Sequence, residues 1–162
     1  MWRSARLEAD FPNLAAAGYE LTSPCANPPT CIGYALGDFD YIWDANGAVI
    51  KEPGYRWLPD GPFDFQIDTV AKIFELHGYT RCRLDDSLEE GYEKIAIYED
   101  KRENREEPFS HVARQLPNGK WTSKLGPDED IEHDTLTALE GNTWVHQKSY
   151  GRVVRIMKRR VR

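Results

Sequence analysis

The sequence lacks long apolar runs and lacks a paired set of cysteines. No apolar stretch approaches the roughly 20 residues that a membrane helix requires, and residues 1–6 have no apolar core of a signal peptide. The three cysteines, Cys25, Cys31 and Cys82, are an odd number, which is typical of a reducing compartment rather than of a disulfide scaffold. We therefore expect a cytoplasmic protein with no membrane contact. A bridge between Cys25 and Cys31 across the short, proline-rich loop stays open as an alternative.

The chain also lacks a net positive charge. Its formal net charge is −6 at pH 7, which argues against a protein that binds nucleic acid by general neutralisation of phosphates. The last eleven positions are an exception, because they hold six of the 21 basic residues: Arg152, Arg155, Lys158, Arg159, Arg160 and Arg162. We expect this basic tail to be solvated or paired with the acidic body, with weak contact to nucleic acid as the lesser alternative.

Tight metal-binding spacings are absent as well. No pair of residues has the CxxC or HxxxH pattern that indicates zinc, so a set made of Cys31, His111 and His133, with Cys25 as a further ligand, is a weak alternative. We expect no metal and no cofactor. No internal repeat interrupts the 162 residues, and 40% of them are hydrophobic, which predicts one α+β domain over residues 1–162.

The apolar pattern predicts two clear helices. Thr30 can cap a short helix that ends at Gly37. The stripe made by Val70, Ile73 and Phe74 predicts a second helix, which ends at Gly78. Aromatic residues are frequent between residues 39 and 65. We expect most of these rings to be core, with the alternative that some line a groove beside Cys31.

Alternating segments predict a mostly antiparallel sheet of about five strands, with a short edge strand near 19–22 as an addition. The five segments are 80–84, 93–99, 109–116, 120–125 and 151–158. The residues Pro117-Asn118-Gly119 are the strongest hairpin signal, and Asn46-Gly47 predicts a tight turn. A further helix is expected to begin at Asp130 or Glu132 and to end at Gly141.

Cys31 and His111 are the first candidates for catalysis. Cys31 would lie in the first turn of its helix, where free N–H groups and the helix dipole favour the thiolate. His111 begins an apolar run that predicts a strand, so its imidazole could be held at the edge of the sheet, facing that helix. A buried structural thiol is the plain alternative for Cys31.

The order of these residues resembles the papain-like superfamily, in particular its compact bacterial cell-wall peptidases and papain-fold toxins. A cysteine on a helix, then a histidine on a strand, then a hairpin with a third polar group carry this resemblance. The segments 91–98, 111–126 and 130–133 are also similar to an uncharacterised bacterial domain family, over nearly the whole chain. In that family Asn or Asp usually precedes the cysteine, where this chain has Thr30. The resemblance implies a papain-like fold with the cysteine helix packed on the sheet.

The resemblance further implies a third catalytic residue on the strand after the histidine. That position points to Ser123 or Thr122, whereas His133 and Asp130, just beyond the strand, are chemically better suited and could fold back. We rank His133 first, Asp130 second and Ser123 third. Asp130 could instead cap a helix, and His133 could bind a turn.

The function implied by the resemblance is that of a cysteine hydrolase or acyltransferase. Cys31 would attack an amide, ester or thioester carbonyl of a peptide or protein substrate, and His111 would carry the proton. The alternative is a non-catalytic papain-like module, such as an immunity or accessory protein, that binds a partner protein through its acidic body and exposed aromatic loop.

Overall fold

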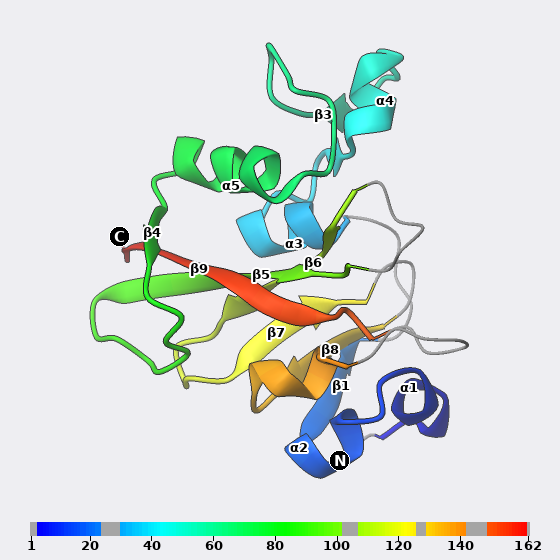
Figure 1. The fold of residues 1–162 in the computed structure, drawn as a ribbon, viewed down its shortest axis with the longest axis vertical. Helices are drawn as coiled ribbons and strands as arrows, with labels where there is room; N and C mark the ends of the chain where they lie inside the picture. Colours follow the sequence, from blue (N-terminus) through cyan, green and yellow to red (C-terminus); the bar gives the residue numbers. More distant parts are fainter. Residues whose placement is uncertain (1–2, 24–29, 102–106, 126–128, 142–148, 162) are drawn as a thin grey trace.

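Seven antiparallel strands form the main sheet of this computed structural model, which describes residues 3–23, 30–101, 107–125, 129–141 and 149–161. The strand order is β1-β8-β7-β6-β5-β9-β4 (Figure 1). The strands are β1 (Tyr19–Ser23), β4 (Thr80–Cys82), β5 (Tyr92–Glu99), β6 (Phe109–Gln115), β7 (Trp121–Lys124), β8 (Asp130–His133) and β9 (Arg152–Arg160). Two short strands, β2 (Ile42–Trp43) and β3 (Tyr55–Arg56), pair in parallel outside this sheet.

The predicted α+β class and the mostly antiparallel sheet are confirmed, but about five strands was too low a number. The segment Asp130–His133, which we expected to begin a helix, is strand β8, and it pairs with both β1 and β7. Its side chains alternate between partly exposed and buried, with Ile131 and His133 buried, as in a strand covered on one face. The hairpin at Pro117-Asn118-Gly119 joins β6 to β7 as predicted.

The helices are short and lie on both faces of the sheet. They are α1 (Ala5–Asp10), α2 (Leu14–Ala17), α3 (Cys31–Leu36), α4 (Ala45–Val49), α5 (Ile67–Leu76) and the 3₁₀ helix η1 (Leu136–Leu139). The helices α3 and α5 lie on one side of the sheet, and α1, α2 and η1 lie on the other (Figure 1). The hydroxyl of Thr30 accepts a hydrogen bond from the Gly33 N–H, and Gly37 ends α3 in the left-handed conformation, so both predicted caps are confirmed.

Strand β5 separates two hydrophobic clusters and so defines the two faces of the sheet. Ile95 and Ile97 belong to the cluster on what we call the first face. Ala96 and Tyr98 belong to the cluster on the second face. Successive side chains of a strand point to opposite sides, so the residues of β5 join the two clusters alternately.

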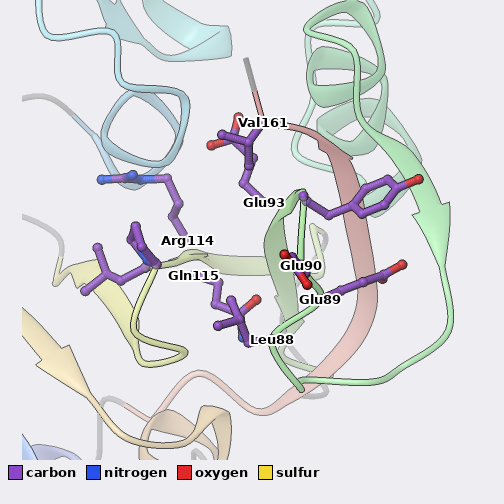
Figure 2. Close-up of a pocket in the computed structure, with 11 residues that line it drawn as sticks. Leu88, Glu89, Glu90, Glu93, Arg114, Gln115 and Val161 are labelled. Carbon is purple, nitrogen blue, oxygen red and sulfur yellow. The ribbon is translucent and has the colours of Figure 1, made fainter.

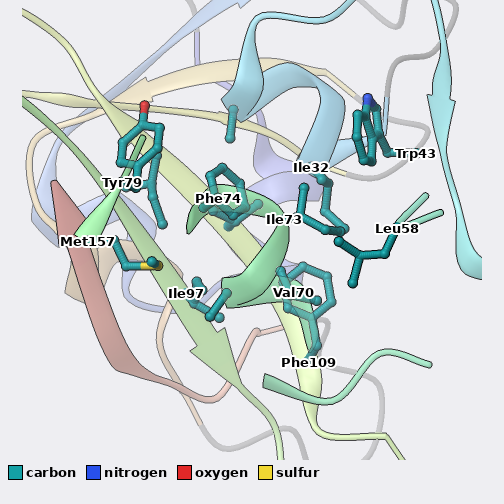
Figure 3. Close-up of a cluster of buried hydrophobic side chains, with 14 of the residues drawn as sticks. Ile32, Trp43, Leu58, Val70, Ile73, Phe74, Tyr79, Ile97, Phe109 and Met157 are labelled. Atoms are coloured by element: carbon teal, nitrogen blue, oxygen red, sulfur yellow. The ribbon is translucent and has the colours of Figure 1, made fainter. Parts of the chain in front are cut away.

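The first face is covered by α3 and α5. Val70, Ile73 and Phe74 of α5 and Ile32 of α3 are all at most 1% exposed, and they pack with residues of β5, β6 and β9 (Figure 3). Burial of each such side chain contributes about 1.5–3 kcal/mol, so this cluster fixes both helices on the sheet.

The second face is covered by the N-terminal helices and by η1. Leu7 of α1, Leu14 of α2 and Leu139 of η1 are fully buried against Trp121 and Ile131 of the sheet. The expected helix around Leu139 is only the four-residue η1, because β8 occupies the preceding residues.

The basic C-terminal segment lies inside the sheet as β9, between β5 and β4. Arg155 Nη2 lies 2.9 Å from Asp68 Oδ1, and Lys158 Nζ lies 2.9 Å from Glu89 Oε1. Pairing with the acidic body is therefore the alternative that the structure supports. Across the ranges that the structure describes, we find no helix with the length and apolarity needed to cross a membrane.

Candidate functional site

Cys31 opens α3, as the sequence predicted, but the helix start does not activate its thiol. The residue packs against the hydrophobic cluster of the first face. Burial raises the pKa of the Cys31 thiol to about 11, because the loss of hydration outweighs the opposing hydrogen bonds from the backbone of Val112, Ile32 and Cys31 itself. A thiol with this pKa stays protonated at neutral pH. The predicted stabilisation of a thiolate is therefore a weaker effect than desolvation here.

His111 lies on β6 but points away from Cys31. Val112, the next residue, belongs to the cluster of the first face, and Ala113 belongs to that of the second. By the alternation of the strand, His111 shares the second face with Ala113, where its ring lies 5.5 Å from that of Tyr98. The sheet thus separates the imidazole from the thiol. The expected Cys31–His111 pair is not formed.

The structure does bring His111 together with two other predicted residues, Ser123 and His133. The Ser123 Oγ lies 2.9 Å from His111 Nε2 and 2.8 Å from His133 Nε2. His133 Nδ1 lies 2.8 Å from the carbonyl oxygen of Thr135, which can only accept, so Nδ1 carries the proton. Nε2 of neutral His133 then accepts from the Ser123 hydroxyl, and the Ser123 oxygen accepts from His111 Nε2–H. We call this chain the His–Ser–His relay.

Both histidines of the relay are neutral at pH 7. Burial holds the pKa of His111 well below 6.5, and the nearby His133 lowers it further. Burial also lowers the pKa of His133 to about 4, although the Thr135 carbonyl oxygen and the charges of Asp134 and Glu132 oppose this shift. Ser123 has no exposed surface. A substrate cannot reach its oxygen, so the relay is a buried structural network in this fold.

Asp130 lies on the first face and cannot orient His111, contrary to its predicted role. Its carboxylate lies 3.4 Å from the buried Nζ of Lys124 and accepts a hydrogen bond of 2.6 Å from Ser23 Oγ. Of the three candidates for a third catalytic residue, Asp130 thus belongs to a different site from His133 and Ser123.

A metal site is not assembled from these residues. Cys31 is a free thiol on the first face, while His111 and His133 lie on the second. Within the described ranges, no group of three or more His, Cys, Asp or Glu side chains is arranged to hold a metal ion. Cys25, the further ligand of the zinc alternative, lies outside the described residues.

The aromatic segment between residues 39 and 65, whose rings we expected to lie mostly in the core, forms part of an exposed arm. We call residues 38–66 the arm; it contains β2, α4 and β3 and extends from the sheet beyond α3 and α5 (Figure 1). Trp43, Trp57 and Leu58 are buried in the first cluster, as expected of core rings. Other large apolar side chains of the arm are exposed, and they are Phe39, Tyr41, Val49, Ile50 and Phe63.

The arm also has an excess of negative charge. It holds six acidic residues, Asp38, Asp40, Asp44, Glu52, Asp60 and Asp64, against two basic ones, Lys51 and Arg56. Arg56 is engaged within the arm, because its guanidinium lies 3.7 Å from the centre of the Tyr41 ring and 3.8 Å from Asp38 Oδ2. The arm therefore presents apolar side chains within an acidic surround.

The chain matches one known protein family. Residues 20–158 match the family described as "Domain of unknown function (DUF7689)", and the chain belongs to this family. No curated protein matches the chain, and no solved structure does. The match covers the whole main sheet apart from the first residue of β1 and the last two of β9.

Proposed function

We propose that the protein is a non-catalytic binding module that holds a partner protein on the arm. The exposure of Phe39, Val49 and Ile50 on one protruding segment carries this proposal. Large apolar side chains that gather on one exposed element are typical of protein-binding surfaces, where aromatic and aliphatic anchors supply most of the affinity.

The arm is pre-organised for binding, which lowers the entropy that association loses. Trp57 Nε1 donates a hydrogen bond of 2.9 Å to the carbonyl oxygen of Pro62. Trp43 Nε1 donates one of 2.8 Å to Asp38 Oδ2. Both indoles are buried, so they fix the base of the arm while the apolar side chains around them stay exposed.

The charge of the arm indicates the chemistry of the partner. An acidic surface attracts a basic one and repels another acidic one, and this selection acts mainly on the rate of association. We infer a partner that presents apolar side chains flanked by lysine or arginine. Binding should weaken as salt is raised, because exposed charges are screened.

A pair of matched serine substitutions tests this proposal. Ile50 of the arm is 67% exposed and Leu76 of α5, outside the arm, is 66% exposed. Immobilised wild-type protein, Ile50→Ser and Leu76→Ser would be used to capture proteins from cells that produce the chain, with quantification by mass spectrometry at low and high salt. We expect Ile50→Ser to lose a partner, captured most strongly at low salt, that Leu76→Ser retains. Identical capture by both variants would refute the proposal.

A papain-like cysteine hydrolase is the competing function. It requires Cys31 and His111 to share a proton. The positions of these side chains on opposite faces of the sheet and the raised pKa of the thiol favour the binding module over the hydrolase.

A further inference from the structure

Two edge strands, β1 and β4, end the main sheet, and a gap interrupts it between β5 and β6. The gap is a pocket of about 440 Å³, and before Ile95 strand β5 pairs only with β9 (Figure 2). Of the two edge strands, β4 has three residues and β1 has five, Tyr19–Ser23. In the described part of the chain, the longer edge without a neighbouring strand is therefore that of β1 (Figure 1).

The backbone groups of Tyr19 and Leu21 point away from the sheet. The Asp134 N–H donates to the Gly18 carbonyl oxygen at 3.1 Å, so Gly18 faces β8, and by the alternation of an antiparallel pair Glu20 does as well. The N–H and C=O groups of Tyr19 and Leu21 then lie on the outer side of β1. No hydrogen bond of the described residues engages these groups. An unpaired row of this kind is a template for a further strand.

Two like charges lie opposite each other on β1 and β8. Glu20 is in register with Glu132, which is in register with Thr122 of β7. All three side chains lie on the first face, because the Thr122 hydroxyl is hydrogen-bonded to Tyr34 of α3. Glu132 accepts a hydrogen bond of 3.0 Å from Asn118 Nδ2, and no ion pair of the described residues reaches either carboxylate. Like charges directly opposite are unfavourable, so a cation at the next strand position would stabilise this row.

A cavity beside Glu20 has room for a basic side chain. Its volume is about 310 Å³, and two cations, Arg3 and Lys120, line it. Both are paired elsewhere: Lys120 Nζ lies 3.6 Å from Asp134 Oδ1, and Arg3 Nε lies 3.7 Å from Glu8 Oε2. A lysine or arginine of an added strand, placed opposite Glu20, would supply the missing positive charge.

We propose that β1 binds a partner protein by addition of an antiparallel strand in which a lysine or arginine is flanked by apolar residues. The basic residue lies opposite Glu20 on the first face. The apolar residues lie opposite Tyr19 and Leu21, whose side chains belong to the cluster of the second face. The backbone groups of these apolar residues point toward β1 and bond to those of Tyr19 and Leu21.

A second copy of this chain fits the edge less well than a basic partner. Twofold antiparallel pairing centred on Leu21 places Thr22 opposite Glu20, so it supplies no positive charge and brings a second pair of glutamates to the interface. The edge shares no residue with the arm. The proposal is therefore separate from the binding of a partner on the arm.

The test compares two peptides on the intact protein. The probe is the seven-residue peptide acetyl-Thr-Val-Lys-Val-Lys-Val-Thr-amide, and its counterpart has glutamate in place of both lysines. NMR titration gives the affinity at the edge from the amide signal of Leu21. We expect the lysine peptide to bind at least tenfold more tightly than the glutamate peptide. Equal affinity, or no change of the Leu21 signal, overturns the proposal.

Two N-methylated forms of the lysine peptide separate strand addition from attraction of charge alone. N-methylation of the central valine removes an N–H that donates to β1, whereas N-methylation of the first lysine removes one that points away from it. We expect the valine form to bind at least tenfold more weakly and the lysine form to change by less than twofold. Equal effects of the two methyl groups overturn the proposal.

Matched variants assign the charge effect to Glu20. Glu20→Gln should weaken binding of the lysine peptide at least threefold, whereas Glu75→Gln, at an exposed glutamate of α5, should leave it unchanged. An unchanged affinity of Glu20→Gln overturns the proposal. Ile50→Ser should bind the peptide as the wild type does, and a loss there would assign the peptide to the arm and overturn this proposal alone. A dimer in light scattering whose dissociation shifts the Leu21 signal would assign the edge to a second copy and overturn it as well.

Discussion

The imidazole of His111 stacks on the phenol ring of Tyr150, with centroids 4.3 Å apart and planes inclined by 7°. The ring of Tyr98 lies on a further side at 5.5 Å, and the Ser123 oxygen accepts a hydrogen bond from His111 Nε2–H. Burial and the nearby His133 lower the pKa of this imidazole, and no acidic side chain of the described residues is among the causes of the shift. A proton added to it would bring a charge among rings and neutral groups, so the neutral form is the one that the fold stabilises.

The neutral relay predicts a loss of stability in mild acid. The folded-state pKa values of His111 and His133 lie below the unfolded value of about 6.5, so the unfolded chain binds more protons than the native one. The contribution of these two histidines to the free energy of unfolding is full above pH 6.5. It is lost as the pH falls toward about 4, the pKa of folded His133. We expect the free energy of unfolding to fall by about 1.4 kcal/mol per pH unit for each histidine below pH 6.

Urea unfolding at pH 7.5, 6.0 and 5.0 would measure this slope. His133→Gln should reduce the slope by about half, because one of the two titrating groups is removed. His77→Gln is the control, since this imidazole lies at the end of α5 and is exposed. A slope that is the same in all three proteins would contradict the assignment of the titration to the relay.

Removal of the central hydroxyl should destabilise the fold. In Ser123→Ala, His111 Nε2 and His133 Nε2 both lose their partner inside the protein, and we expect a loss of about 1–3 kcal/mol in the free energy of unfolding. Ser87→Ala, at an exposed serine, should change it by less than about 0.5 kcal/mol. Urea unfolding at pH 7.5 gives both values, and similar losses in the two variants would count against the relay.

The thiol of Cys31 should react slowly. At pH 8 a thiol with a pKa of about 11 contains roughly two hundredfold less thiolate than an ordinary thiol with a pKa of about 8.5. We expect iodoacetamide to modify Cys31 correspondingly more slowly than an unstructured cysteine peptide, as followed by peptide mass spectrometry. Rapid alkylation that disappears in His111→Ala would instead support the cysteine hydrolase.

Gly151 should tolerate no side chain. A Cβ there would lie 2.0 Å from the Glu99 carbonyl oxygen, and φ is +81°. Gly54 has a similar φ of +85° but open space around it. Gly54→Ala should cost about 1–2 kcal/mol for the left-handed backbone alone. Gly151→Ala should cost at least twice as much, because the backbone of β5 must also move, and equal losses in urea unfolding would contradict this account.

Local signals in the sequence identified the elements best. The caps of α3, the apolar stripe of α5 and the hairpin after β6 depend on residues within a few positions of one another, and all three are confirmed. The pair Asn46-Gly47 was misread as a tight turn. Asp44 caps α4 there, and a Cβ on Gly47 would lie 1.9 Å from the Tyr55 ring, so this glycine permits close packing rather than a turn.

The candidate site could not be predicted because it depends on which face of the sheet each side chain of β6 points to. Phe109 and Val112 share the first face although they are three positions apart, an odd number, because β6 and β5 change register between the Tyr98 and Glu99 pairs. A change of register by one residue moves a side chain to the other face. The run from His111 to Leu116 predicts a strand, but nothing in it tells on which face His111 lies.

The position of β9 between β5 and β4 makes the protein intolerant of shortening. Without residues 152–160, β4 would have no neighbour, and β5 would present a full row of bare amides and carbonyls to any other chain. A chain truncated before β9 would therefore aggregate and would not remain as a smaller folded protein.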